Sequence, residues 1–254
     1  IVPAIEYLAD QGYKKFFLLG SDYVFPRTAN MIINAQIDAI DGVEVVGEEY
    51  ASMDQTEFSS IISKIEAAQP DVIINTLNGT GNVSFFKQLA DRNITSDQMM
   101  TMSFSIAEEE VQTIGSDILK GNLVSWNYYQ TTDTEKNKEF VEAYKAKYGE
   151  DRVTSDPAEA AYDAVYMWKA ACEKAGSFDT DDVREALDGL SIDAPEGTIT
   201  VDGENQHLYK TVRIGQVADD GLIYEQYSTD SPVKPDPYLT TYDWAVDAGV
   251  QPLE

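Results

Sequence analysis

Cysteine and histidine are nearly absent from this sequence, which holds one of each, Cys172 and His207. A single cysteine excludes an internal disulfide and leaves the cellular compartment open. Cys172 stands among apolar residues of a helical pattern, so we expect a buried thiol. A catalytic thiol would need a neighbouring histidine, and no histidine or cysteine cluster has the spacing of a metal site.

Basic residues are also scarce, because 18 lysines and arginines face 45 acidic residues and the net charge is -27. This charge repels phosphate backbones and anionic lipids, so we expect no nucleic-acid partner and no direct membrane insertion. No apolar run approaches the roughly 20 residues of a membrane span. The sequence shows no secretory signal. It opens on an amphipathic helical pattern over residues 1–10, so we expect further sequence upstream, and a signal peptide removed from there would leave no trace in this sequence.

Hydrophobic residues make up 43% of the chain, enough for a core, and the first half alternates strand and helix patterns. Strands are predicted over residues 15–19, 43–50, 72–76, 99–103 and 123–129, with helices over residues 29–40, 58–65 and 83–89 between them. The strands are apolar runs, as expected when both faces of a sheet are covered. This alternation predicts an α/β fold with a parallel sheet between layers of helices.

The pattern changes after residue 130. We predict helices over residues 134–148, 156–175 and 180–187, a β segment over residues 198–227 with turns at 202–203 and 220–221, and an extended tail. Capping boxes are predicted at residues 54–57 and 105–108, and Asp156 is predicted to cap its helix.

Three loops of the first half are expected to meet, since ligands of open parallel sheets bind outside the carboxyl ends of the strands. They span residues 20–27, 76–82 and 103–110. Their aromatic, hydroxyl, amide and carboxylate groups suit a small, planar, polar and neutral molecule. The candidate ligand-binding residues are Tyr23, Phe25, Asn78, Gly79, Ser103, Ser105 and Glu108.

Each candidate also has a structural interpretation. The two aromatic side chains could shield the sheet edge, Asn78 and Gly79 could serve a turn, and Glu108 could complete the capping box with Ser105. Arg27 stands at a helix start, where the helix dipole disfavours a cation. It could contact a ligand or form a surface ion pair.

No residue is assigned a catalytic role, and no metal or cofactor is expected. The Gly-Thr-Gly run at residues 79–81 lacks the lysine and hydroxyl that follow in a phosphate-binding loop. Acidic residues are abundant, but nothing singles out an acid–base pair, although a pair of the glycosidase type stays open.

Six short motifs, in order along the chain, carry a resemblance to a known family. They are residues 20–27 (GSDYVFPR), 75–79 (NTLNG), 103–110 (SFSIAEEE), 159–162 (EAAY), 193–197 (DAPEG) and 235–238 (PDPY). Together they resemble the urea-binding and short-chain-amide-binding proteins of ABC transporters, in the branched-chain amino-acid-binding group. A bacterial amide sensor that regulates amidase expression shares the pattern, with tyrosine at the position of Phe25. The resemblance runs from residue 1 to about residue 238.

The resemblance implies a type I periplasmic-binding-protein-like fold, with two lobes that close on the ligand about a hinge and a first lobe that is incomplete here. Residues 1–125 would form the second, C-terminal lobe, residues 126–195 the returning part of the first lobe, and residues 196–254 the hinge crossover, a β segment and the tail. It carries ligand contacts over to Tyr23 and Phe25; the other candidates rest on loop position.

The implied function is capture of urea or a short-chain amide in the periplasm, or otherwise outside the cytoplasm, and delivery to the permease subunits of an ABC transporter. An amide-sensing regulator or receptor domain of the same fold is the alternative. An amide hydrolase would need a nucleophile with a base, or a metal, and neither is evident.

Overall fold

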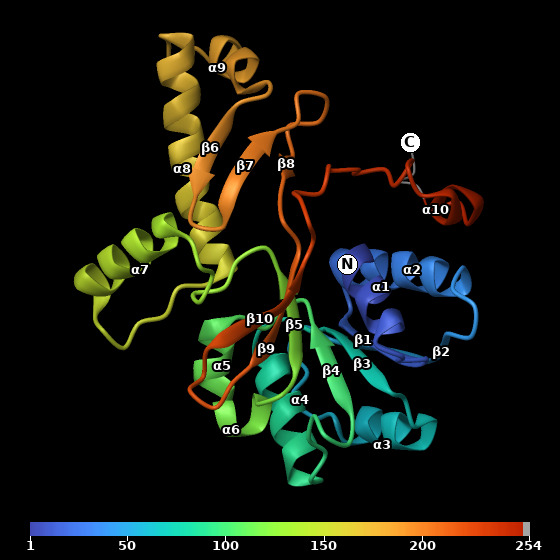
Figure 1. The fold of residues 1–254 in the computed structure, drawn as a ribbon. Helices are drawn as coiled ribbons and strands as arrows, with labels where there is room; N and C mark the ends of the chain where they lie inside the picture. Colours follow the sequence, from blue (N-terminus) through green and yellow to red (C-terminus); the bar gives the residue numbers. More distant parts are fainter. Residues whose placement is uncertain (251–254) are drawn as a thin grey trace.

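The structure, a computed structural model, describes residues 1–250 and contains one large sheet (Figure 1). Its strands lie in the order β10-β9-β5-β4-β3-β1-β2. Five run parallel: β1 (Lys15–Ser21), β2 (Glu44–Ala51), β3 (Val72–Thr76), β4 (Met100–Ser103) and β5 (Leu123–Trp126). The other two, β9 (Arg213–Val217) and β10 (Ile223–Ser228), extend the sheet antiparallel. The predicted α/β class and all five predicted strands are confirmed, although β5 ends at Trp126 and not at residue 129.

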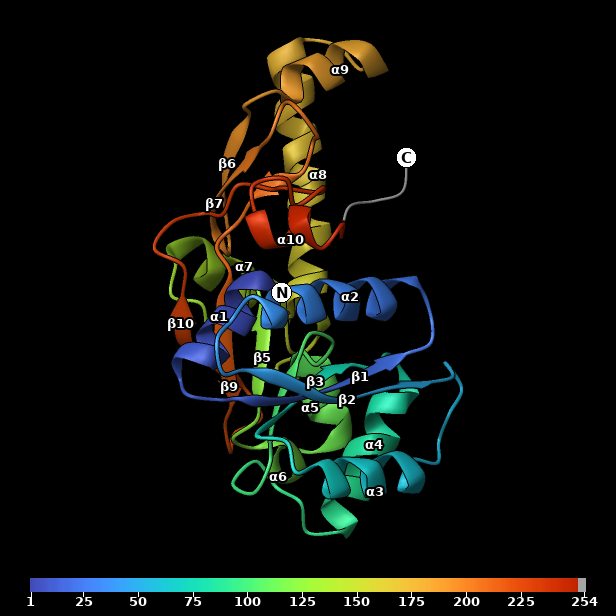
Figure 2. The ribbon, with the colours of Figure 1, turned by 90° about the vertical axis from the view of Figure 1, so that its right-hand side faces the viewer.

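Helices cover both faces of this sheet, as Figures 1 and 2 show. On one face lie α1 (Val2–Asp10) and α2 (Val24–Asp38), and on the other α3 (Ser59–Ala68), α4 (Thr80–Asp91), α5 (Glu108–Ile114) and α6 (Ser116–Leu119). The side chains of β1 alternate between the two cores: Phe16 packs with α1 and α2, and Phe17 with α3 and α4. Burial on both sides explains why the strand is a continuous apolar run.

A second, smaller unit lies beyond one end of the large sheet (Figure 1). It contains α7 (Glu135–Tyr148), α8 (Asp156–Ala175), α9 (Thr180–Leu187) and an antiparallel sheet of β6 (Ser191–Ala194), β7 (Gly197–Val201) and β8 (Leu208–Tyr209). Cys172 is buried between α8 and α9, as predicted.

Three chain segments cross between the units: residues 127–134 after β5, residues 210–212 before β9, and the segment that leaves β10 at residue 229. The segments bond to one another. Asn127 donates its side-chain amide to the carbonyl of Thr211 at 2.8 Å, and the N–H of Val233 donates to the carbonyl of Lys210 at 2.8 Å. Hydrogen bonds therefore tie the three crossing segments to one another at the junction.

All three predicted helix caps are wrong in detail. The helix predicted to follow residues 54–57 begins at Ser59, whose N–H donates to the Glu57 carboxylate at 2.9 Å, so Asp54 lies in the preceding turn. For α5, Glu110 in place of Glu108 accepts the N–H of the residue that precedes the helix, at 2.9 Å. At α3 the predicted box is absent, whereas at α5 the bond to the residue before the helix comes from a glutamate two positions further along.

At α8, Ser155 precedes the helix, and Asp156 is its first residue. The carboxylate of Asp156 accepts hydrogen bonds from outside α8: the N–H groups of Asn127 and Tyr128 donate to it, at 2.9 and 3.0 Å. The predicted β segment divides into strands of two different sheets, with its predicted turns in place at residues 202–203 and 220–221. Strand β6 was not predicted, and the tail contains a short helix, α10 (Asp243–Asp247), that contacts α2.

Candidate functional site

The three predicted loops follow β1, β3 and β4, which are adjacent in the sheet, and the segment after β5 continues them as one row along the carboxyl edge. In the order β5-β4-β3-β1, the strands lead into residues 127–130, 104–108, 77–79 and 22–25. The register places Asn75 beside Ser103, and Thr76 beside Gly20. The fold thus brings together segments that are far apart in the sequence, and we refer to them as the strand-end row.

Two buried asparagines hold the middle of the row. The side-chain amide of Asn75 donates to Asn82 at 2.9 Å and to the hydroxyl of Ser103 at 3.0 Å. Asn82, on α4, donates in turn to the hydroxyl of Ser105 at 3.3 Å and to the carbonyl of Leu77 at 2.8 Å. Ser103 is itself buried, so it belongs to the floor of the row. Sequence reasoning did not single out either asparagine, although Asn75 closes an apolar strand.

The loop after β3 combines a turn with a contact to the first loop. The N–H of Asn78 donates to the hydroxyl of Ser21 at 3.0 Å, and the Asn78 side chain donates to the carbonyl of Thr76 at 3.1 Å. Gly79 precedes α4 with φ 61° and ψ -139°, a conformation that favours glycine. These bonds agree with the turn interpretation of Asn78 and Gly79, and they leave the exposed Gly79 backbone at the surface of the row.

Two aromatic side chains lie at the β1 end of the row. Tyr23 directly precedes α2 and is half-buried, Phe25 is 37% exposed, and their ring centroids are 6.3 Å apart. Arg27 instead forms an ion pair with Asp22 at 2.6 Å and lies 4.3 Å over the ring of Tyr50. Of the two interpretations of Arg27, the surface ion pair is therefore the one present.

Glu108, the first residue of α5, lies toward the β5 end of the row and is fully buried. Its Oε1 accepts the N–H of Gln130, in the first crossing segment, at 2.7 Å. Among residues 1–250, no donor reaches its Oε2. Burial raises the pKa of this carboxyl to about 8. Glu108 therefore joins the sheet edge to the junction and retains an unused acceptor.

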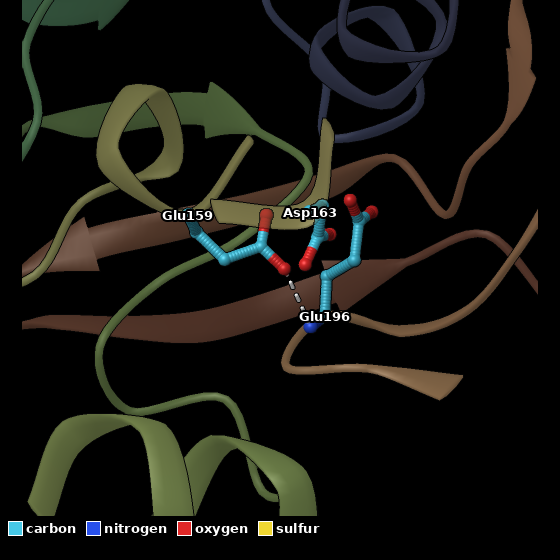
Figure 3. A group of neighbouring side chains, drawn as sticks. All are labelled: Glu159, Asp163 and Glu196. Atoms are coloured by element: carbon cyan, nitrogen blue, oxygen red, sulfur yellow. Dashed lines mark hydrogen bonds between the residues drawn. The ribbon is translucent and has the colours of Figure 1, made fainter. Parts of the chain in front are cut away.

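A second polar group lies at the junction, on the side of the smaller unit. Glu159 and Asp163 on α8 approach Glu196, from the turn between β6 and β7 (Figure 3). Burial raises the pKa of all three carboxyls, and Lys210 pairs with Glu196 at 2.6 Å. Sequence reasoning assigned no metal and missed this group, although two of the quoted motifs contain Glu159 and Glu196. The only signal was the spacing of two acids four residues apart on one helix.

A large groove of about 680 Å³ lies beside this group, between α7 and α8, and Asp163 is among its lining residues. Aromatic side chains line it, including Phe140, Tyr144, Tyr148, Tyr162 and Tyr166. Several of them are markedly exposed, for example Tyr148 at 55% and Tyr166 at 48%. A broad apolar face of this kind is suited to another protein surface, whereas a small polar solute needs converging hydrogen-bonding groups.

A parallel sheet with a polar row at its strand ends, joined by crossing segments to a second unit, is the architecture of a two-lobed binding protein. The chain belongs to the periplasmic binding protein domain family, whose model matches residues 1–243. Its fold is the α/β fold of type I periplasmic binding proteins, and the predicted fold class is thereby confirmed.

Three known proteins illustrate what this chain is similar to. A Leu/Ile/Val-binding protein homolog 6 of Brucella melitensis is 26% identical over 230 residues, 88% of this chain and 58% of that protein. A solute-binding protein of an ABC transporter from R. palustris, solved with 4-hydroxybenzoate, matches with a TM-score of 0.84 at 24% identity and covers 94% of this chain and 66% of that one. A limonene hydroxylase of Geobacillus stearothermophilus is 31% identical over 127 residues, 50% of this chain and 23% of that protein.

The chain thus spans less than two thirds of the length of these relatives. Within residues 1–250, no helix combines the length and the apolar character that crossing a bilayer requires.

Proposed function

We propose that this chain is part of a solute-binding protein that captures a small neutral amide, such as urea, at the strand-end row. The observation that carries the proposal is the row itself: amide and hydroxyl groups fixed by Asn75 and Asn82, with the unused acceptor of Glu108 toward one end and partly exposed aromatic rings at the other. Amide N–H groups need acceptors, and the flat faces of an amide suit stacking on Tyr23 and Phe25.

Charge favours a neutral ligand over an anion. The described part of the row holds the buried Glu108, and the two arginines beside the row are already paired, Arg27 with Asp22 and Arg213 with Glu225. An anionic ligand would meet a chain of net charge -27 without a free cation in the described part of the row. Urea has few heavy atoms, so at a ceiling of about 1.5 kcal/mol per atom its affinity is limited to about 6 kcal/mol, or tens of micromolar.

The proposed mechanism is closure of two lobes about the junction. Residues 1–125 would form one lobe, residues 126–195 part of the other, and residues 196–254 the crossover, the β segment and the tail, of which residues 251–254 lie outside the described part. Ligand would shift the balance between open and closed forms, and the permease subunits of an ABC transporter, outside the cytoplasm, would recognise the closed form.

Two other readings of the same fold have specific support. The similarity to a Leu/Ile/Val-binding protein homolog favours an amino acid as the second candidate ligand. The amide-sensing regulator also resembles this sequence and would use the same row without a transporter. An enzyme has less support, since the likeness to limonene hydroxylase covers 23% of that protein and the row holds no nucleophile–base pair in its described part.

The test is calorimetric titration of urea, acetamide, leucine and 4-hydroxybenzoate into the intact protein. Heat with urea or acetamide alone supports the proposal, and Phe25→Ala should then weaken binding about tenfold, as expected for loss of an aromatic contact. The matched control is Phe178→Ala, since Phe178 is 81% exposed on the other unit. Heat with leucine favours the amino-acid candidate. Silence from all four ligands, or release of ammonia from the amides, would overturn the proposal.

A further inference from the structure

A group of buried carboxylates lies at the junction, separate from the strand-end row. Glu159 and Asp163 stand four residues apart on α8, and Glu196 comes from the β6–β7 turn (Figure 3). One oxygen of each residue lies within 4.8 Å of the others. The side chains are 0%, 2% and 2% exposed, respectively. Three acidic groups are therefore held together away from water.

Most oxygens of this group have no hydrogen-bond donor. Among the described residues, neither oxygen of Asp163 has a partner, and neither has Oε2 of Glu159. Glu159 does accept the N–H of Glu196, at 3.0 Å. In the view of Figure 3 the Asp163 carboxylate lies between those of the two glutamates. Buried oxygens without donors are costly, so their convergence on one point is itself an observation that indicates a ligand.

One lysine among the described residues pairs directly with a carboxyl of the group. The Nζ of Lys210 lies 2.6 Å from Oε1 of Glu196. The same lysine also faces Glu159 and Asp156. One lysine therefore stands beside four carboxyl groups in a region of low solvent access.

We propose that Glu159, Asp163 and Glu196 bind a divalent cation, and that calcium is the ion that fits best. All the available donors are oxygens, which hard cations prefer, and neither histidine nor cysteine takes part. Calcium accepts carboxylates in one- or two-oxygen mode with flexible geometry, so three carboxylates supply roughly three to six of its six to eight ligands. The smaller magnesium ion would demand a near-octahedral arrangement.

The position of the site gives the ion a mechanical effect. The carbonyl of Glu196 accepts a guanidinium N–H of Arg213 at 2.8 Å, and Asp156, three residues before Glu159, accepts the N–H groups of Asn127 and Tyr128. An ion shared by α8 and the β6–β7 turn would join the places where two crossing segments attach. It would stiffen the junction independently of any solute in the row.

The experiment is calcium titration of the intact protein after removal of divalent ions with a chelator, by calorimetry and by displacement of luminescent terbium. We expect one saturable site per chain and a higher thermal midpoint with calcium. Asp163→Asn should weaken calcium binding at least tenfold. The matched control is Asp193→Asn. Asp193 is exposed, belongs to the β6–β7 hairpin that also carries Glu196, and accepts the Thr198 hydroxyl. The Asp193→Asn variant should bind calcium as the native protein does.

A second variant distinguishes calcium binding by the three carboxylates from a purely structural role of these side chains. Lys210→Gln removes the competing positive charge, so calcium affinity should rise severalfold. If Asp163→Asn fails to fold, as judged by circular dichroism, Glu159→Gln carries the same test. Absence of calcium and terbium uptake at millimolar concentration, or native affinity in a folded Asp163→Asn or Glu159→Gln variant, would overturn the proposal.

Discussion

The buried carboxyl of Glu108 predicts a specific dependence of stability on pH. Its pKa is about 8 in the folded chain against a usual value of 4.5, because burial disfavours the charged form. The folded state therefore holds the proton more tightly than the unfolded state does. The contribution of this group is full below pH 4.5 and is lost as the pH rises toward about 8. The difference corresponds to about 5 kcal/mol in all, or about 1.4 kcal/mol for each pH unit.

The assay compares the intact protein with Glu108→Gln, by guanidinium unfolding at several values between pH 5 and pH 8. Glutamine keeps the shape and an acceptor for the N–H of Gln130, but it cannot ionise. We expect similar stabilities near pH 5 and a variant that is more stable by about 4 kcal/mol at pH 8. Urea should not be the denaturant, since it is the proposed ligand. Parallel pH profiles of the two proteins would refute the reasoning, because they would mean that Glu108 is ionised in the folded state.

Three further predictions follow from the row and the core. Urea affinity, measured calorimetrically, should rise up to tenfold per pH unit between pH 6 and pH 8 if the ionised Glu108 accepts the amide N–H groups, and a flat profile would argue against that contact. Asn82→Ala leaves a buried amide group of Asn75 without one acceptor and should lower the free energy of unfolding by about 1–3 kcal/mol while weakening urea binding; unchanged binding would place the ligand elsewhere. Phe85→Ala, in the core between α3 and α4, should cost about 3–5 kcal/mol in the same assay without changing urea affinity, and a loss of less than 1 kcal/mol would contradict its packing.

The parallel half of the fold could be predicted because its strands are apolar on both faces. Residues 72–76 form a strand with the predicted bounds, since each side chain meets a helix layer. Strand β6 was missed for the opposite reason: two of its four residues are exposed, so it has no apolar pattern. The helix caps were misplaced because several acidic residues compete for the same free N–H groups, and only local backbone geometry selects among them.

The site could be predicted only in part. The position of the loops followed from the rule for parallel sheets, and the structure places them side by side as expected. The asparagine network was not predictable, because the sequence indicates only a strand position for Asn75 and a loop position for Asn82. Their side chains come into contact only in the fold. Glu196 is 37 residues from Glu159 in the sequence, and acids four residues apart on a helix are common on solvated surfaces.

The insertion of β9 beside β5 sets an order of events during synthesis. Trp126 pairs with Arg213, so the whole smaller unit is made before the large sheet can add its sixth strand. At about 5–20 residues per second, the edge of β5 stays unpaired for several seconds after it leaves the ribosome. An unpaired strand edge is a template for aggregation, and such non-local pairing slows folding. Slow translation through residues 127–212, or a chaperone that covers β5 in that interval, should therefore govern the yield of folded protein more than any single contact of the finished sheet.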